Sequence, residues 1–521
     1  MSTPMSTIKV CSGVLLNNDY KHTIWFDDHS KQLAYFAGKV VKTFSAYTYI
    51  RKSWSIKVDA TMEQARTWSY LYFQNGNGKT YFYFINTIEY INDNTVELFI
   101  EMDVMQTYLH EYTLHRCFVE REHSATDEIG DNVLDEGLEL GELTVNTKNN
   151  LNMQELVLLI LSTGYPIGDD GVGGYTYKNF NGVFSGLMVY AVQSSKWASL
   201  GNDLLQNANF NEAIVSMWMY PKSLVNIVGE WDNEIASIYH EVTGAGTLSG
   251  FTFSRPDKLN GYTPVNKKLL TYPYNMLYVS NNAGGASVYR YERFNDPTQC
   301  QLRVCGAVSP EGGTKLFPIA YNDVTINYDE GIIGANYPSC AWNQDMYKLW
   351  LAQNQNSQNL ALLTGGIQIL AGAGMAIGSG GLGTMAGAGL MTSGASTIAG
   401  LLAQRADMDV QPPQARGGFS SSINVVSEHQ TYTVMAKTID KHHAKMIDNY
   451  FSMYGYKTHL VKIPNRNVRE NWTYTKTIDC HVSGSLCTDD LRKIQSIYDN
   501  GITFWKNGDS IGSYGLSNNC L

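Results

Sequence analysis

The sequence lacks most of the short motifs that indicate catalysis or cofactor binding. It has no phosphate-binding P-loop, and its eight cysteines form no CxxC pair that could begin a zinc or redox site. The nearest approach to a zinc-protease motif, His110-Glu111-Tyr112-Thr113-Leu114-His115, has one residue too many between its histidines, so on a helix they would point apart. A GxGxxG match from Gly378 to Gly383 follows no predicted strand and is discarded. We therefore predict a protein without catalytic residues, metal or cofactor.

Positive charge is also scarce. The formal net charge is −10, with 38 Lys and Arg against 48 Asp and Glu. A surface that coats nucleic acid needs clusters of basic side chains, so that function is excluded, whereas a channel through which DNA passes without sticking is compatible. Residues 1–21 have neither a basic start nor an apolar run long enough for a signal peptide. We expect synthesis and folding in a cytoplasm, with the cysteines as reduced structural thiols.

The longest stretch without charge runs from Leu349 to Gln404, which contains no Asp, Glu, Lys, Arg or His. Its core, Leu360 to Leu402, is far longer than the roughly 18 residues that can cross a bilayer. More than a quarter of this core is Gly, which weakens a helix by about 1 kcal/mol per residue relative to Ala. We interpret the stretch as a membrane-active loop. A buried plug or packing segment and a low-complexity linker are the alternatives.

The large apolar residues of this core are the candidate membrane-contacting residues. They are Leu360, Leu362, Leu363, Ile367, Ile369, Leu370, Met375, Ile377, Leu382, Met385, Leu390, Met391, Ile398, Leu401 and Leu402. Polar segments flank the core as stems, with Gln353 to Asn359 before it and Gln411 to Gly418 after it.

Strand signals dominate the N-terminal part. The 34 Tyr of the whole chain also favour half-buried strands. The alternation of Trp54, Ile56 and Val58 with polar residues predicts a strand. A short helix is predicted from Met62 to Phe73, capped by Thr61 or Asp59, followed by strands that begin near Tyr81 and Thr95. We predict a β-meander with one helix.

The strand predicted from Thr95 to Val104 carries three carboxylates on one face. Its apolar residues share the other face and are Val96, Leu98, Ile100, Met102 and Val104. Glu97, Glu101 and Asp103 then point the opposite way, together with Phe99. Such a face is either an ordinary solvated surface or the lining of an acidic lumen. The seven acidic residues between Asp127 and Glu142 predict, by contrast, an exposed loop.

Further along the chain the pattern is mixed. Helices are predicted at Asn209 to Met219 and Asn233 to Val242, and a hairpin is predicted from Leu269 to Phe294. The predicted C-terminal elements are a strand from Ser422 to Ala436, helices from Ile439 to Met453 and from Thr488 to Tyr498 that end at Gly455 and Gly501, and a strand from Ile502 to Trp505.

An ordered set of segments resembles a known family. The set comprises Asn18-Asp19-Tyr20-Lys21, Trp25-Phe26, Phe73-Gln74-Asn75, Glu101-Met102-Asp103-Val104-Met105-Gln106-Thr107-Tyr108, Phe118-Val119-Glu120-Arg121-Glu122-His123, Leu134-Asp135-Glu136-Gly137-Leu138, Lys268-Leu269-Leu270-Thr271-Tyr272-Pro273-Tyr274, Pro338-Ser339-Cys340-Ala341-Trp342, Tyr450-Phe451, Tyr454-Gly455-Tyr456, Ile463-Pro464-Asn465 and Asp499-Asn500-Gly501-Ile502-Thr503-Phe504-Trp505. In this order it is similar to the distal tail-knob, or tail-tube, proteins of phi29-type short-tailed bacteriophages (picovirus-like podophages).

The resemblance implies a homohexameric tube at the distal tip of the virion tail, built from β-barrel-like domains with an acidic lumen. It implies contact with an upper tail or collar protein and passage of phage genomic DNA without sequence-specific binding. The loops of the subunits would plug the tube and then enter the lipid of the host cytoplasmic membrane as a pore.

The resemblance and the residue patterns together predict a mainly β fold with α+β parts and five segments. They are an N-terminal β tube domain (1–145), an inserted mixed α/β domain (146–290), a β segment returning to the tube (291–348), the apolar loop with its stems (349–416) and an α+β segment completing the tube domain (417–521). A soluble pore-forming toxin-like protein and a receptor-binding tail protein with a packed apolar loop are the alternative functions.

Overall fold

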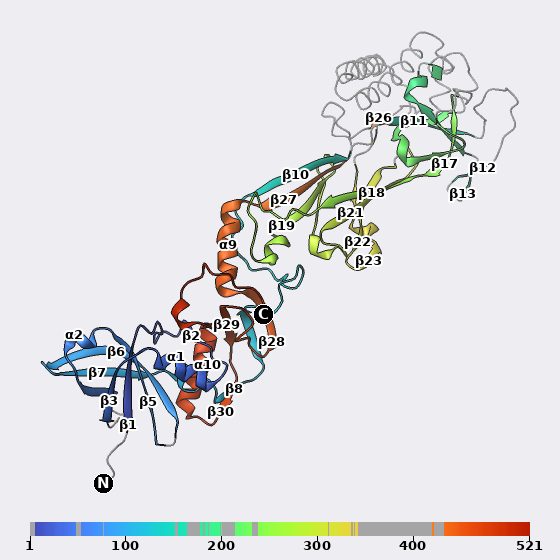
Figure 1. Ribbon diagram of the computed structural model, residues 1–521. Helices are drawn as coiled ribbons and strands as arrows, with labels where there is room; N and C mark the ends of the chain where they lie inside the picture. Colours follow the sequence, from blue (N-terminus) through green and yellow to red (C-terminus); the bar gives the residue numbers. More distant parts are fainter. Residues whose placement is uncertain are drawn as a thin grey trace, which may run out of the picture. The chain divides into compact units, whose positions relative to one another are not determined.

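The computed structural model describes residues 6–47, 54–76, 78–151, 155–163, 178–180, 183–185, 187–197, 199–200, 214–231, 238–310, 312–334, 337, 339–341, 419–420 and 432–521. In this part of the chain β-strands dominate, the sheets are largely antiparallel and α-helices are few (Figure 1). The predicted mainly β class is therefore confirmed.

The chain divides into two compact units, each built from segments that are distant in sequence. Unit 1 comprises Met1–Glu142, Gly261–Pro273 and Asp440–Leu521, and unit 2 comprises Leu143–Asn260 and Tyr274–Ile439. The two ends of the chain therefore share unit 1. The predicted segment 291–348 belongs to unit 2, together with most of the predicted inserted segment 146–290.

The first sheet of unit 1 has six antiparallel strands in the order β3-β1-β5-β6-β7-β4. The strands are β1 (Ser6–Ser12), β3 (Val40–Tyr47), β4 (Ser55–Asp59), β5 (Trp68–Gln74), β6 (Thr80–Asn92) and β7 (Thr95–Met102). Buried residues alternate with more exposed residues in β4 and β7, which confirms the strands predicted from that alternation. Within the described residues, β3 and β4 are the two edges of this sheet.

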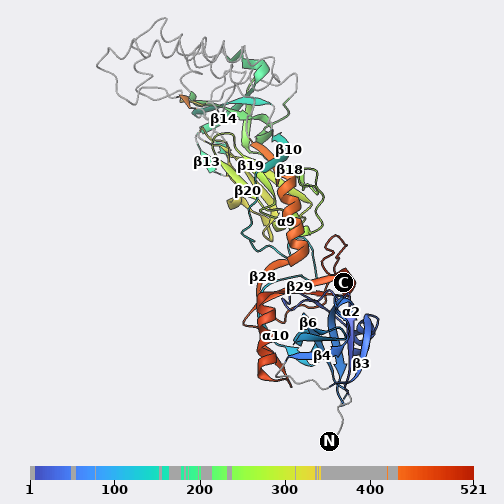
Figure 2. The same ribbon diagram turned by 90° about the vertical axis from the view of Figure 1, so that its left-hand side faces the viewer.

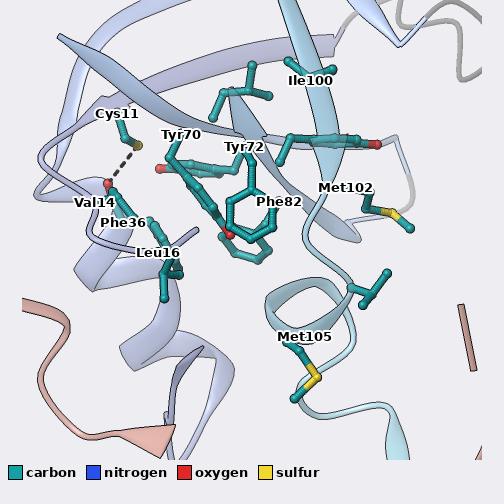
Figure 3. Close-up of a cluster of buried hydrophobic side chains, with 14 of the residues drawn as sticks. Cys11, Val14, Leu16, Phe36, Tyr70, Tyr72, Phe82, Ile100, Met102 and Met105 are labelled. Carbon is teal, nitrogen blue, oxygen red and sulfur yellow. Dashed lines mark hydrogen bonds between the residues drawn. The ribbon is translucent and has the colours of Figure 1, made fainter. Parts of the chain in front are cut away.

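The core of this sheet is filled by aromatic side chains around Phe36 (Figure 3). Phe36 lies on α1 (His29–Ala37), which Asp28 caps by accepting a hydrogen bond from the Lys31 amide at 2.8 Å. Its ring stacks on Tyr70 of β5 at 5.2 Å and contacts Phe82 of β6 at 4.7 Å, measured between ring centroids. Burial of a Phe side chain stabilises a fold by about 1.5–3 kcal/mol, so α1 is held to the sheet largely by this residue.

The second sheet of unit 1 joins the beginning of the chain to its end. Its order is β2-β31-β29-β9-β28, formed by β2 (His22–Ile24), β31 (Ile502–Trp505), β29 (Trp472–Ile478), β9 (Cys117–Glu122) and β28 (Tyr456–Lys462). β2 pairs with β31 in parallel, and the other neighbours are antiparallel. A separate pair consists of β8 (Tyr112–Leu114) and β30 (Val482–Gly484).

Besides α1, the described residues of unit 1 contain further helices. They are α2 (Met62–Ala65), α3 (Val104–Thr107), α9 (Lys441–Tyr454) and α10 (Thr488–Asn500), with 3-10 turns at η3 (Lys267–Leu270) and η8 (Gly508–Ser510). α10, drawn in red in Figure 2, packs against β29 and β30. The predicted ends of the two long helices are confirmed, because Gly455 and Gly501 follow them with φ of 63° and 91°. The predicted strand from Ile502 to Trp505 is also confirmed as β31.

The described residues of unit 2 form four sheets. The largest has seven strands in the order β16-β17-β14-β11-β15-β25-β26, another has β10-β27-β19-β20, a third has β18-β21-β22-β23 with β24 beside β22, and the smallest pairs β12 with β13. The bounds are β10 (Leu143–Leu151), β11 (Leu156–Thr163), β12 (Lys178–Phe180), β13 (Val183–Ser185), β14 (Leu187–Gln193), β15 (Ile214–Pro221), β16 (Val225–Ile227), β17 (His240–Ala245), β18 (Thr247–Ser254), β19 (Asn275–Ser280), β20 (Ala286–Tyr289), β21 (Gln299–Gly306), β22 (Thr314–Tyr321), β23 (Val324–Ile326), β24 (Ile332–Ile333), β25 (Ser339–Ala341), β26 (Phe419–Ser420) and β27 (Tyr432–Ile439). The 3-10 turns are η1 (Ser194–Lys196), η2 (Lys222–Leu224), η4 (Tyr291–Arg293) and η5 (Tyr328–Glu330).

Three predicted helices are wrong in whole or in part. In the stretch predicted as a helix from Asn209 to Met219, the described residues from Ile214 onward form β15. The helix predicted from Asn233 to Val242 overlaps β17, which begins at His240. The helix predicted from Met62 to Phe73 stops at Ala65 and gives way to β5.

Other predictions on unit 2 hold. The hairpin is confirmed as β19 and β20, which pair from Ser280↔Ala286 outward, although Lys267–Leu270 is a 3-10 turn and not part of the strand. The predicted strand from Ser422 to Ala436 is confirmed from Tyr432 onward and continues to Ile439.

The prediction that the acidic segment from Asp127 to Glu142 is an exposed loop is wrong in part. Its Glu136 side chain has no exposed surface and forms ion pairs with Arg121 and with Lys268. Glu136 also accepts a hydrogen bond from the Lys457 amide at 3.0 Å. The segment is therefore anchored to unit 1 by a buried carboxylate, because two cations and an amide offset the cost of removing its charge from water.

Candidate functional site

The predicted membrane-contacting residues, from Leu360 to Leu402, lie outside the described residues, but the strands nearest to them in sequence are described. β25 ends at Ala341 and β26 begins at Phe419. The two strands pair antiparallel, with Ser339 opposite Ser420 and Cys340 opposite Phe419. β25 and β26 are thus adjacent strands at one end of the seven-stranded sheet.

No helix in the part of the chain that the structure describes is both long enough and apolar enough to cross a membrane.

The predicted acidic face is carried by β7, between β6 and β4. Val96, Leu98, Ile100 and Met102 are buried, and Glu97 and Glu101 point to the opposite side, as predicted. Glu97 accepts a hydrogen bond from the Ser55 hydroxyl at 2.7 Å. In the strand registers it lies opposite Lys57 on β4 and opposite Glu89 on β6, so two carboxylates and one ammonium form a row across the sheet.

Glu101 is the most strongly paired carboxylate on this face. Its oxygens accept hydrogen bonds from the Lys493 ammonium of α10 at 2.6 Å, from the Asn18 amide group at 3.0 Å and from the Asn86 amide group at 3.1 Å. Burial raises the pKa of Glu101, but these donors outweigh burial, so its pKa lies below the ordinary value. Because Lys493 offsets the charge of Glu101, the net negative charge of the face rests mainly on Glu97 and Glu89. Lys493 comes from the far end of the chain, and no local signal in the sequence indicates this pairing.

Asp103 does not belong to the acidic face. β7 ends at Met102, and Asp103 caps α3 by accepting hydrogen bonds from the Met105 and Gln106 amides at 3.0 and 3.1 Å. The Tyr70 hydroxyl also donates to it, at 2.8 Å. The side chain is buried, and burial raises the pKa of Asp103 to about 6. The strand alternation fails here because β7 ends at Met102 and Asp103 is already the N-cap of α3.

The histidines that resemble a zinc-protease motif are not brought together as ligands. His115 contacts the Ser483 hydroxyl at 2.7 Å, and His110 packs against His29. Among the described residues, no group of three His, Cys, Asp or Glu side chains is placed to hold a metal ion.

A formal GxSxG match, Gly508-Asp509-Ser510-Ile511-Gly512, is also present in the sequence. A nucleophile elbow requires a tight turn from a strand into a helix. Here η8 carries Ser510, and residues 511–521 continue without a further α-helix. The match therefore lacks the strand-to-helix turn of a nucleophile elbow.

Comparison with known families first identifies the class of protein. The family described as "Caudoviral major tail protein N-terminus" matches residues 4–113, which contain the whole six-stranded sheet. The chain is thus similar, in this part, to the major tail proteins of tailed phages.

A second match covers more than half of the chain and identifies the family itself. The C-terminal domain of the tail knob protein gp9 of Bacillus phage phi29 matches residues 242–519. The chain belongs to the family of phi29-type tail knob proteins. This is a family of structural, non-enzymatic components of the virion tail.

Individual relatives extend the similarity over the full length. The tail knob proteins gp9 of Bacillus phages B103, PZA and phi29 are 25%, 26% and 25% identical to the chain, and each comparison covers 98% of the chain and 98% of the relative. The tail knob protein gp12 of bacteriophage C1 has the same fold, with a TM-score of 0.66 at 13% identity, over 99% of the chain and 100% of that protein. The resemblance predicted from the ordered segments is confirmed.

Proposed function

We propose that six copies of this chain assemble into a tube at the distal end of the phage tail. The genome leaves the virion through this tube. The apolar loops of the subunits close the tube before infection and then insert into the host cytoplasmic membrane as a pore. An upper tail or collar protein of the same virion attaches to the other end.

The observation that carries this proposal is the pairing of β25 with β26. The chain between these strands includes a long stretch without any charged residue, yet its two ends are side by side on unit 2. A segment with adjacent ends can change its conformation or environment without disrupting the sheet from which it projects. This arrangement supports a loop that can be replaced without loss of the sheet, and not a strand of the core.

Two features of unit 1 support a tube. β3 and β4 are edges of the six-stranded sheet within the described residues, and an unpaired edge is a natural surface for pairing with another copy. In the row across β4, β7 and β6, the carboxylates of Glu97 and Glu89 outnumber the ammonium of Lys57, so this row has a surplus of negative charge. In a lumen, such a face repels DNA phosphates and allows the genome to slide without binding.

The membrane step follows from the composition of the loop. In a closed tube, apolar loops from several subunits bury each other and exclude water. Their glycines permit a second packing in lipid, where every backbone polar group must find a partner within the assembly. A contact at the tail tip then needs to shift the balance between the two states by only a few kcal/mol.

A charge in the middle of the loop tests this step. Ala386→Lys and Ala388→Lys each introduce an ammonium far from both polar stems. A Lys at the centre of a bilayer costs about 2.5–3.5 kcal/mol, and in a homo-oligomer every subunit contributes that cost. We expect both variants to lose dye release from anionic liposomes while still assembling.

Ala386→Leu is the matched control, because it enlarges the same side chain without adding charge. It should release dye as the wild type does. Undiminished release by both Lys variants would show that this segment does not enter the membrane.

A further inference from the structure

A cavity of about 1000 Å³ lies within unit 1, beside the second sheet. Its wall combines the acidic segment, the turn at η3, the end of α9, the start of β29 and the C-terminal tail. The residues that decide its chemistry are His123, Asp127, Lys267, Arg469, Trp472 and Leu516. The acidic face of β7 does not contribute to it.

Arg469 is the unusual member of this wall. Its side chain is only 4% exposed, and Nη1 donates a long hydrogen bond of 3.5 Å to the Asn518 carbonyl. Nε and Nη2 have no hydrogen-bond partner among the described residues. A buried guanidinium without partners is costly, so a ligand that satisfies these groups gains binding energy from them.

The two unpartnered nitrogens lie on the same edge of the guanidinium plane. Their N–H groups are parallel and spaced to match the two oxygens of a carboxylate or of a phosphate. A residue that lines the cavity therefore holds one half of a bidentate ion pair, and no described residue supplies the other half.

The other charged groups around the cavity already have partners. Asp127 accepts hydrogen bonds from the Tyr456 hydroxyl at 2.5 Å and from the Lys267 amide at 3.3 Å. The Lys267 ammonium contacts both oxygens of Glu128 at 3.0 Å. Of these groups, Arg469 is thus the one with side-chain donors that no described residue satisfies.

The His123 side chain adds no positive charge to the cavity. Its Nδ1 accepts a hydrogen bond from the Tyr474 amide at 2.8 Å, which requires an unprotonated nitrogen. Burial, and next the charge of Arg469, lower the pKa of His123 to about 3. The imidazole is thus neutral under ordinary conditions.

The cavity is much larger than an inorganic ion and has apolar as well as polar walls. Trp472, Met453 and Leu516 contribute to the lining. The wall formed by the tail is fixed, because the Asn518 side chain donates to the Trp472 carbonyl at 2.9 Å and accepts from the Asn471 and Trp472 amides at 2.9 and 3.0 Å. Space and lining both favour an anionic group that is attached to a small organic body.

We propose that this cavity binds a small organic anion whose carboxylate or phosphate group takes the Nε–Nη2 edge of Arg469. The proposal is independent of tube assembly and of the membrane step.

Titration calorimetry on the full-length protein tests it with three probes at equal ionic strength. Glycerol 3-phosphate and glycerate carry the two anionic groups on similar bodies, and glycerol is the neutral counterpart. We expect saturable binding of at least one anionic probe and none of glycerol. Comparison of the two anions then shows whether the site prefers phosphate or carboxylate.

Arg469→Gln should weaken the binding by about tenfold or more, because it removes a charged bidentate donor. Leu516→Trp reduces the space in the cavity but keeps Arg469, so it should weaken binding too. If Arg469→Gln fails to fold, the affinity of the Leu516→Trp protein tests the proposal instead. Lys31→Gln removes an exposed positive charge on α1 and should bind as the wild type does.

Absence of anion binding to the wild-type protein up to about 10 mM would overturn the proposal. So would wild-type affinity in a folded Arg469→Gln protein, or wild-type affinity in the Leu516→Trp protein.

Discussion

At the scale of single residues, buried charge controls the stability of unit 1. Glu136 sits between Arg121 and Lys268, and the Lys268 side chain is only 2% exposed. Burial lowers the pKa of Lys268, and Glu136 opposes this effect. Lys268 also donates to the Leu134 carbonyl at 2.8 Å, so the network ties the acidic segment to η3 and β9.

Glu136→Gln should destabilise the protein by about 3–5 kcal/mol, because it leaves two buried cations without their shared counter-charge. The measurement is the free energy of unfolding in urea. Glu139→Gln, an exposed neighbour in the same segment, should change stability by no more than about 0.5 kcal/mol. Equal effects of the two substitutions would show that the pairs seen around Glu136 are not a source of stability.

His123 predicts a pH dependence with a definite sign. Its pKa falls from 6.5 to about 3 on folding because the ring is buried. Between these values the unfolded chain binds more protons than the folded protein, so His123 makes stability fall as the pH falls below 6.5. The slope from this group is at most about 1.4 kcal/mol per pH unit.

His123→Asn should remove this part of the slope. The urea midpoints of both proteins are measured at about pH 7, 6 and 5, and their change with pH is compared. Groups that both proteins share, such as Asp103, contribute equally to the two curves and cancel in the difference. Parallel curves for the two proteins would contradict the buried, neutral state of His123.

Sequence patterns predict single residues well where the backbone is regular. The alternation in β7 correctly places Glu97 and Glu101 opposite Val96, Leu98, Ile100 and Met102. The same alternation misplaces Asp103, because the strand has already ended. The acidic composition of its segment predicts an exposed Glu136, and this prediction is wrong. Its partner Lys268 is 132 residues away, and composition does not indicate so distant a contact. No sequence pattern indicates that Arg469 is buried with two unpartnered nitrogens.

At the scale of elements, helix ends are set by close backbone contacts. α9 ends at Gly455, whose φ of 63° is unfavourable for any residue with a Cβ. A Cβ at this position would lie 2.2 Å from the Glu122 carbonyl oxygen and 2.5 Å from the His123 nitrogen. The end of α9 is thus packed directly onto the end of β9.

Gly455→Ala should therefore cost clearly more than backbone strain alone, and we expect a loss of more than about 2 kcal/mol. Gly512→Ala is the matched control, since Gly512 has a φ of 86° but nothing within 4 Å of the added Cβ. It should cost about 1 kcal/mol. Thermal or urea unfolding of the two variants measures the difference, and similar losses would contradict the contact between α9 and β9.

The wrong helix prediction over β15 has a physical cause. β15 is an interior strand that pairs with β11 and β25, and it is buried along almost its whole length, so it shows a nearly continuous apolar run instead of an alternation. Such a run cannot be distinguished from a buried helix by periodicity alone. α9 and α10 were predicted correctly because each has a polar face, an apolar face and a glycine at its end.

At the scale of the whole molecule, the family and the full-length relatives establish a tail knob protein. The proposed function of the loop also requires that residues between β25 and β26 can be removed without unfolding either unit. Replacing Leu360 to Leu402 by a short Gly/Ser linker should leave both units folded, since the entropy of closing a surface loop changes little with its length. The deletion protein should also assemble, because the edges β3 and β4 are unchanged.

Electron microscopy of the purified full-length protein beside this deletion protein, both without lipid, tests the central claim most directly. We predict rings of six subunits in both samples, with density closing the channel of the full-length protein and an open channel in the deletion protein. Monomers in the full-length sample would contradict a pre-assembled tube and would favour a toxin-like protein that assembles only on membranes. Rings with the same open channel in both samples would contradict the plug.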